Sequence, residues 1–156
     1  MNPYTYKVSL RVFHPAMDPQ LITDTLGMQP NKVQKVGNPR TTPTGTVLEL
    51  CYSRSYWSFS FTTPDDSDVE EFLARTVEGL RQHRSFFWKI LDTGGDVEFF
   101  IGLFADGVNI GTTLPHELLM ILGDLGINLE LDIYDYKTDK NQSTYRKLGN
   151  MPPAPE

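Results

Sequence analysis

Cysteine and long apolar runs are both scarce in this sequence, and each absence excludes a class of protein. The single cysteine, Cys51, excludes an internal disulfide and an all-cysteine zinc site. It lies in an apolar run, so we expect a buried, inert thiol. No N-terminal segment has the apolar core of a signal peptide, and no run approaches the ~20 apolar residues that a membrane helix needs. We therefore expect a cytoplasmic protein that does not associate with a membrane.

Basic charge is also limited. The 156 residues contain 14 Lys and Arg against 20 Asp and Glu, which gives a formal net charge of −6. Non-specific binding to nucleic acid or to an anionic membrane calls for a basic face, so this balance argues against both partners. It favours solubility and, if the protein binds another protein, a basic one. The length suits a single domain with one hydrophobic core.

Known catalytic signatures are missing as well. There is no glycine-rich phosphate loop and no Gly-x-Ser-x-Gly elbow. The three histidines, His14, His83 and His116, are far apart and do not have metal-ligand spacing, so a structural or solvated role is expected for each. The sequence thus indicates no catalytic residue, no metal site and no cofactor. It bounds the function without defining it.

Hydrophobic periodicity predicts an α+β fold, in which an antiparallel sheet packs with helices in a two-layer sandwich. A strand is expected over 4–13 and another over 97–104, and Ser67 with Glu70 forms a capping box for a main helix over 68–80. We expect a single domain over 1–136 and a polar C-terminal extension over 137–156. The predicted core of the sheet consists of Leu10, Phe99, Ile101, Leu131 and Ile133.

One pattern occurs twice. Residues 26–29, "LGMQ", and residues 125–128, "LGIN", each follow a strand and a short helix. The glycine in each suits a left-handed helix stop. Two such strand–helix units would make a pseudo-symmetric sandwich, and a chance match is the alternative.

The β-rich segment 46–62 changes phase in its middle, which predicts a hairpin turn or a bulge near Arg54. The aromatic residues after this point alternate, and Trp57 belongs to the set that faces the core. Tyr56 is out of phase with Trp57. We therefore predict that Tyr56 is exposed and anchors a protein partner.

The segment "LELDIYDY", residues 129–136, places acids and a tyrosine on one side of a strand. Glu130, Asp132 and Tyr134 would stand in a row, with ~6.6 Å between alternate positions. Such a row is a solvated strand face, a docking surface for a basic partner, or, with Glu98 as a third acid, part of a metal-dependent hydrolase. We predict the docking surface, because acids beside a tyrosine combine charge steering with rigid contact area.

The sequence leaves two further kinds of site open. Basic residues gather around the proline-rich loop and the hairpin turn, where they could bind an anion. An aromatic pocket between sheet and helix would instead indicate a ligand sensor. The candidate anion-binding residues are Lys32, Lys35, Arg40 and Arg54.

Several segments together resemble the bacterial family of domain of unknown function 4279. They are "LRVF…DPQLITDTLGMQP", "SYWSF" and "LPHELLMILGDLGINLELDIYDY", of which the first and last are the more specific. The Ser-Tyr before Trp57 departs from the less aromatic approach expected there. The resemblance implies a small bacterial or phage-borne cytoplasmic domain and supplies no activity and no site. By analogy, such acidic domains serve as immunity proteins or other partner-binding factors, whose partner would be a toxin or a phage or host protein.

Overall fold

The computed structural model describes residues 4–105 and 109–135. The predicted extension over 137–156 lies outside them. Within the described residues the elements, in chain order, are β1 (Tyr4–His14), α1 (Pro19–Leu26), β2 (Lys32–Gln34), β3 (Pro39–Thr41), β4 (Val47–Cys51), β5 (Ser55–Ser60), α2 (Val69–Leu80), the 3₁₀ turn η1 (Arg81–His83), α3 (Arg84–Asp92), β6 (Asp96–Ala105), α4 (His116–Leu125) and β7 (Asn128–Asp135).

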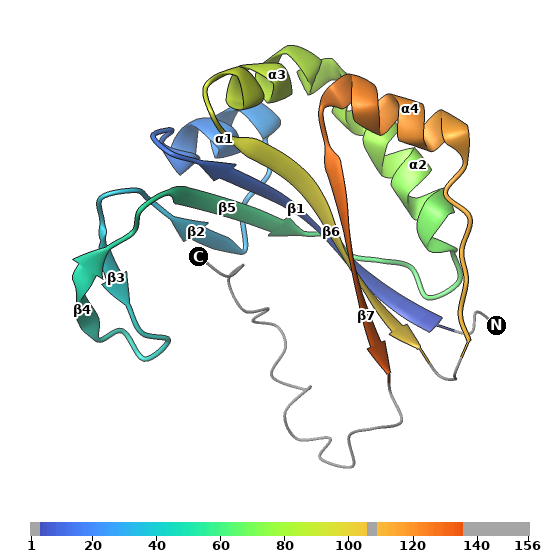
Figure 1. The fold of residues 1–156 in the computed structure, drawn as a ribbon, viewed down its shortest axis with the longest axis horizontal. Helices are drawn as coiled ribbons and strands as arrows, with labels where there is room; N and C mark the ends of the chain where they lie inside the picture. The colour runs from blue at the N-terminus through green and yellow to red at the C-terminus, as the bar shows by residue number, and fades with distance from the viewer. Residues whose placement is uncertain (1–3, 106–108, 136–156) are drawn as a thin grey trace.

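Five strands form the main sheet in the order β2-β5-β1-β6-β7, and the helices lie on one of its faces (Figure 1). The α+β fold class is confirmed. The sheet is mixed rather than wholly antiparallel, because β7 runs parallel to β6. A parallel neighbour needs a crossover connection, and α4 provides it. The remaining strands, β3 and β4, form a separate two-stranded hairpin.

The core lies between the helices and the inner strands. Leu10, Phe99 and Ile101 are fully buried as predicted, and the main helix, α2, packs over them through residues such as Leu73. Trp57 is also fully buried, which confirms its predicted side. Its indole Nε1 donates a hydrogen bond to Thr23 Oγ1 at 3.0 Å, so the one polar atom of the ring is satisfied within the core.

Both residues of β7 that were predicted to lie in the core are exposed. Leu131 is 46% exposed and Ile133 is 62% exposed. Their side of the strand is the predicted one, since they alternate with the acids. The prediction is wrong because β7 is an edge strand, whereas the buried side chains of α2 and α4 pack over the inner strands.

The hairpin of β3 and β4 overturns the prediction for the cysteine. Every residue of β4 is exposed, including Cys51. The apolar run that suggested burial belongs to a hairpin that extends from the sheet on the side away from the helices (Figure 1). Leu50, at 68% exposure, shows how little covers this hairpin.

The repeated Leu-Gly pattern has a clear local structure. α1 ends at Gly27 with φ 67°, and α4 ends at Gly126 with φ 69°, so both glycines adopt the left-handed conformation that stops a helix. Each helix connects two strands that run in the same direction: β1 and β2 around α1 are both antiparallel to β5, and β6 and β7 around α4 pair in parallel. Duplication of the unit stays a hypothesis.

The predicted capping box does not form. Asp68 is the N-cap of α2 and makes no side-chain cap bond. The Ser67 hydroxyl lies 2.6 Å from the Tyr6 hydroxyl, which ties the start of α2 to β1. None of the helices in residues 4–105 and 109–135 has the length and apolar content required to cross a membrane.

We predict that Trp57→Ala lowers the free energy of unfolding by about 3–5 kcal/mol, because it leaves a cavity and removes the partner of Thr23. Chemical denaturation followed by circular dichroism measures this. The matched control is Leu50→Ala on the exposed hairpin, which should change stability by less than ~0.5 kcal/mol. Equal stabilities of the two variants would contradict the placement of Trp57 in the core.

Candidate functional site

The candidate site lies on the face of the sheet opposite the helices, which we call the open face. Side chains alternate along each strand, so Ser9 and Arg11 of β1 point away from the helices that cover Leu10. In the described part of the chain, no helix lies on the open face (Figure 1). Polar side chains such as those of Ser9 and Arg11 therefore lie on the open face.

The predicted row of Glu130, Asp132 and Tyr134, which we call the acid row, lies on this face of β7. Glu130 is opposite Phe100 of β6, and the next two members of the row, Asp132 and Tyr134, are opposite Gly102 and Phe104. Glu130 is exposed, whereas Asp132 and Tyr134 are half-buried. The structure thus brings Glu130, Asp132 and Tyr134 together on one side of an edge strand.

Two contacts of Tyr134 hold the C-terminal end of the row in place. The ring of Tyr134 stacks on Phe104 with a centroid distance of 5.0 Å and an interplanar angle of 10°. Its hydroxyl donates a hydrogen bond to Asp132 Oδ2. Gly102 of β6 lies beside the two stacked rings, and a Cβ at this position would approach the Phe104 ring to 3.4 Å. The glycine therefore gives the stacked rings room to lie across β6.

Glu98 of β6 extends the row inward. Burial, together with the charge of Glu130 and a hydrogen bond with Glu130, raises the pKa of Glu98 to about 7. Asp96 adds to the same effect, while the charge of Arg11 opposes it.

Arg11 is the functional candidate that the sequence did not reveal. It is 3% exposed, and its guanidinium lies 3.6 Å from the centroid of the Phe100 ring. Its Nη1 is 3.8 Å from Glu98 Oε1, an ion pair at the limit of contact. The available signal was a single charged residue within the apolar strand "VSLRVF". A buried arginine beside a carboxyl gives the open face a fixed charge pattern.

These acids do not form a cluster that could hold a metal ion. Among residues 4–105 and 109–135, no group of three or more His, Cys, Asp and Glu has suitable geometry. The acids of the row instead make contacts to a tyrosine, to an arginine and to each other. The chemistry that this arrangement supports is binding of positive charge.

Tyr56 lies elsewhere on the open face. It is 8% exposed, so its predicted exposure is wrong, because its ring packs on Phe13 of β1 at 5.0 Å. Two strands, β1 and β6, separate β5 from the acid row on β7. A partner-binding role for Tyr56 stays a prediction.

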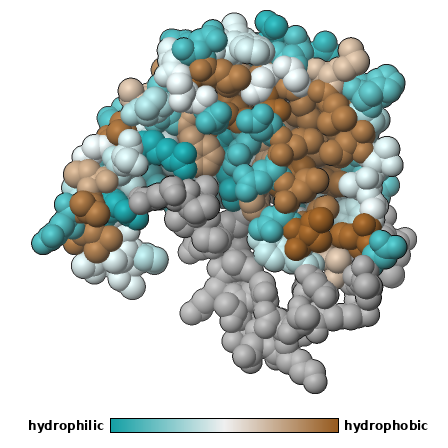
Figure 2. All heavy atoms as spheres, viewed as in Figure 1, coloured by the Kyte–Doolittle hydropathy of each residue, from teal (hydrophilic) through white to brown (hydrophobic). Residues whose placement is uncertain are grey.

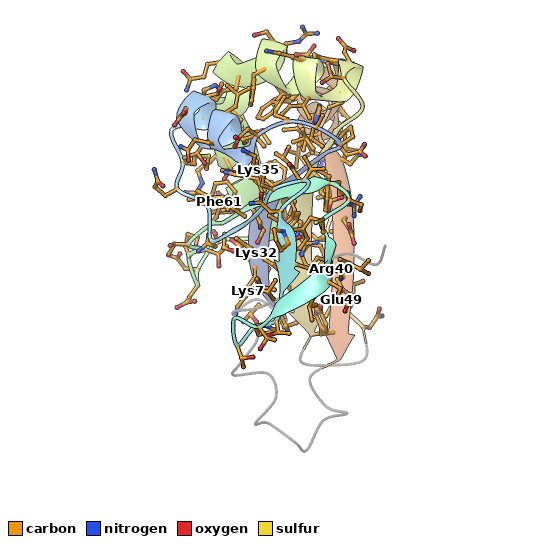
Figure 3. All side chains as sticks on the ribbon, turned by 90° about the vertical axis from the view of Figure 1, so that its left-hand side faces the viewer. Lys7, Lys32, Lys35, Arg40, Glu49 and Phe61 are labelled. Carbon is orange, nitrogen blue, oxygen red and sulfur yellow. The ribbon has the colours of Figure 1, made fainter. Side chains whose placement is uncertain are left out.

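The four basic candidates do not share one environment. Lys35 pairs with Asp18 at 2.6 Å, Lys32 lies over the Tyr56 ring at 5.9 Å, and Arg54 lies over the Phe13 ring at 4.4 Å. Arg40 is half-buried on β3. In Figure 3, Lys35, Lys32 and Arg40 occupy separate positions along this side of the molecule. Anion binding by Lys32, Lys35, Arg40 and Arg54 stays a prediction.

Aromatic side chains between the sheet and α2 contact each other. The Phe61 ring lies 5.0 Å from Phe59, 5.9 Å from Phe72 and 6.1 Å from Phe99. The faces and edges of these rings thus pack against neighbouring rings. The ligand-sensor hypothesis gains no support from this arrangement.

His14 has the structural role that was expected. Its Nδ1 accepts hydrogen bonds from the backbone N–H groups of Ala16 and Met17, and its Nε2 lies 2.8 Å from Thr93 Oγ1. A ring whose Nδ1 accepts is neutral with the proton on Nε2. Burial lowers the pKa of His14, which is consistent with that form. The ring closes the turn after β1.

The fold and the site together define a small α+β domain with a one-sided helix layer and an acidic strand at the edge of its sheet. A family model with the description Domain of unknown function (DUF4279) matches residues 4–136, so the chain belongs to this family and the predicted resemblance is confirmed. No curated protein and no solved structure matches the chain.

The Glu98 carboxyl predicts an unusual dependence of stability on pH. Its pKa is higher in the folded protein than in the unfolded chain, so its protonated form stabilises the fold below about pH 4.5, and this contribution is lost as the pH rises toward about 7. We expect Glu98→Gln to remove the loss. The melting temperature of the variant relative to the parent should therefore rise between these two pH values and stay constant above pH 7.

Two controls separate the causes. Glu130→Gln removes the neighbouring charge but not the burial, so it should remove only part of the effect. Glu49→Gln on the exposed strand β4 should follow the parent at every pH. A constant difference between Glu98→Gln and the parent across this range would contradict the account.

Proposed function

We propose that the protein is a non-enzymatic protein-binding module that acts by occluding a basic protein partner, in an immunity-like or regulatory role. The observation that carries the proposal is the acid row on the open face, where Glu130, Asp132 and Tyr134 stand together on an edge strand. The same proposal places the protein in the bacterial cytoplasm, with a toxin or a phage or host factor as the partner.

Charge supports a basic partner. The chain has a net charge of −6, and Glu98 of β6 lies close enough to Glu130 for the two charges to interact, with Asp96 adding to the negative charge around Glu98. A partner with clustered Lys or Arg would be steered toward this face and would compensate the repulsion between Glu98 and Glu130. Binding of a cation should therefore favour the ionised form of Glu98.

Rigidity supports binding by a preformed surface. Tyr134 is held by the Phe104 ring and by its hydrogen bond to Asp132. A side chain that is already ordered loses less conformational entropy when a partner binds. The row thus combines charge with an ordered aromatic contact, which suits a protein interface.

The test is capture of proteins from lysate of the host by the immobilised protein, with quantification by mass spectrometry. We predict that the parent retains a basic protein which Glu130→Lys with Asp132→Lys fails to retain. Retention should fall as NaCl rises from about 0.05 to 0.5 M, because screening weakens exposed charge pairs.

The control is Glu49→Lys, which changes charge on the distant hairpin and should retain the same protein as the parent. Equal retention by the parent and by the double variant at low salt would contradict the proposal. A rise in melting temperature with Mg²⁺, Mn²⁺, Ca²⁺ or Zn²⁺ that Asp132→Asn abolishes would favour the hydrolase alternative. Circular dichroism confirms that each variant is folded before it is compared.

A further inference from the structure

The two edges of the main sheet differ in how they are protected. β2 has three residues, follows Pro30 and carries Lys32, and short strands with a nearby proline and a lysine are common protection against strand pairing. β7 has eight residues without proline, lysine or glycine. Its pairing with β6 continues without a register shift from Asn128 to Asp135. The outer edge of β7 is therefore long and regular.

Within the described residues, no strand pairs with this outer edge. In an edge strand, every second residue directs both its N–H and its C=O group away from the one neighbouring strand, so the edge offers a row of hydrogen-bonding groups. Addition of an extended segment satisfies such a row, and this is a recurring mode of peptide recognition. The backbone of β7 thus has the geometry for strand addition.

The side chains beside the edge specify the chemistry of the added segment. On the helix side, Leu131 and Ile133 are exposed, and Figure 2 shows apolar side chains gathered over β7 and α4. On the open face, Glu130 is exposed and Asp132 is half-buried. Apolar contacts are thus available on one side of the edge and negative charge on the other.

A second copy of this chain does not fit the edge. Pairing of β7 with β7 of another copy in an aligned register would bring the Glu130 and Asp132 carboxylates of the two copies together on the open face. Like charges on directly opposed strands destabilise a sheet. The acids therefore discourage self-association while they favour a basic strand.

We propose that β7 binds an extended segment of the partner by strand addition, and that this segment alternates basic with apolar residues. Its basic side chains face Glu130 and Asp132, and its apolar side chains cover Leu131 and Ile133. The inference rests on the proposed function and deepens it, because it states how the partner is held and what its sequence pattern is.

Alternation is the specific requirement. Side chains of the added strand point alternately to the two faces of the sheet. A segment with separate basic and apolar blocks would therefore place basic residues beside Leu131 and Ile133 and apolar residues beside the acids. Burial of Leu131 and Ile133 contributes more to affinity than exposed ion pairs do. Loss of the apolar contacts should therefore weaken binding even when the acid row is intact.

The probes are synthetic peptides of about ten residues, which is long enough to span β7. The first alternates Lys with Val, the second has the same composition in two blocks, and the third alternates Glu with Val. Fluorescence anisotropy measures binding, and two-dimensional NMR locates it. We expect the first peptide to bind and to shift the amide signals of Asn128–Asp135, and we expect neither of the other two to bind.

Two N-methylated forms of the first peptide test backbone pairing. One carries N-methyl groups on its Lys residues and the other on its Val residues, so each form blocks one edge of the extended peptide. Strand addition predicts that one form binds like the parent peptide and the other does not bind. Equal binding of the two forms would overturn the proposal.

Protein variants complete the test. Leu131→Ser with Ile133→Ser should weaken binding of the first peptide by about tenfold or more, which corresponds to ~1.4 kcal/mol. Val47→Ser with Leu50→Ser is the matched control, because these hairpin residues are 65% and 68% exposed, and it should bind like the parent. An unaffected β7 variant, or a parent that dimerises through β7 in analytical ultracentrifugation, would overturn strand addition.

The two proposals can fail separately. If Glu130→Lys with Asp132→Lys loses a captured protein but the alternating peptide does not bind, the proposed function stands and strand addition is wrong. If the alternating peptide binds and depends on Leu131 and Ile133, but the lysate yields no basic protein, strand addition stands and the proposed function is wrong.

Discussion

The pairing of β1 with β5 on one side and β6 on the other is the constraint on which the structure depends. Ten residues of β1, Tyr4 to Phe13, are matched with β6, and the second half of the strand is matched with β5. This register sends Leu10 to the helices and Arg11 to the open face. A slip of one residue would exchange them and bury the guanidinium beneath the helices, which is strongly unfavourable.

The acidic character of the open face follows from the same register. Arg11 lies opposite Glu98, and β7 joins β6 on its other side. Because α4 carries the chain across the helix layer, β7 runs parallel to β6, and Glu130 comes close enough to Glu98 to raise its pKa. Residues more than thirty positions apart thus share one electrostatic environment.

Local signals predicted much of this fold. Periodicity located β1, β6 and α2, and the glycines after α1 and α4 marked where those helices end. Alternation also placed Glu130, Asp132 and Tyr134 on one side of a strand. In each of these cases the structure is determined by residues that are close in sequence, so the pattern of one amino-acid sequence is enough to predict it.

The predictions that were wrong concern burial, that is, which other elements cover a segment. Alternation correctly separated Leu131 and Ile133 from the acids, yet their exposure depends on the position of β7 at the edge of the sheet. Cys51 is exposed because its apolar strand joins a separate hairpin, and Tyr56 is buried because Phe13 of another strand packs on it. Strand order is set by long-range pairing, which periodicity does not report.

The most direct test of the central claim is hydrogen–deuterium exchange with the captured basic protein present and absent. Docking on the β7 side of the open face predicts slower exchange of the Asn128–Asp135 amides in the complex, with exchange of the β3–β4 hairpin unchanged. Slower exchange confined to the hairpin, with β7 unchanged, would contradict the account.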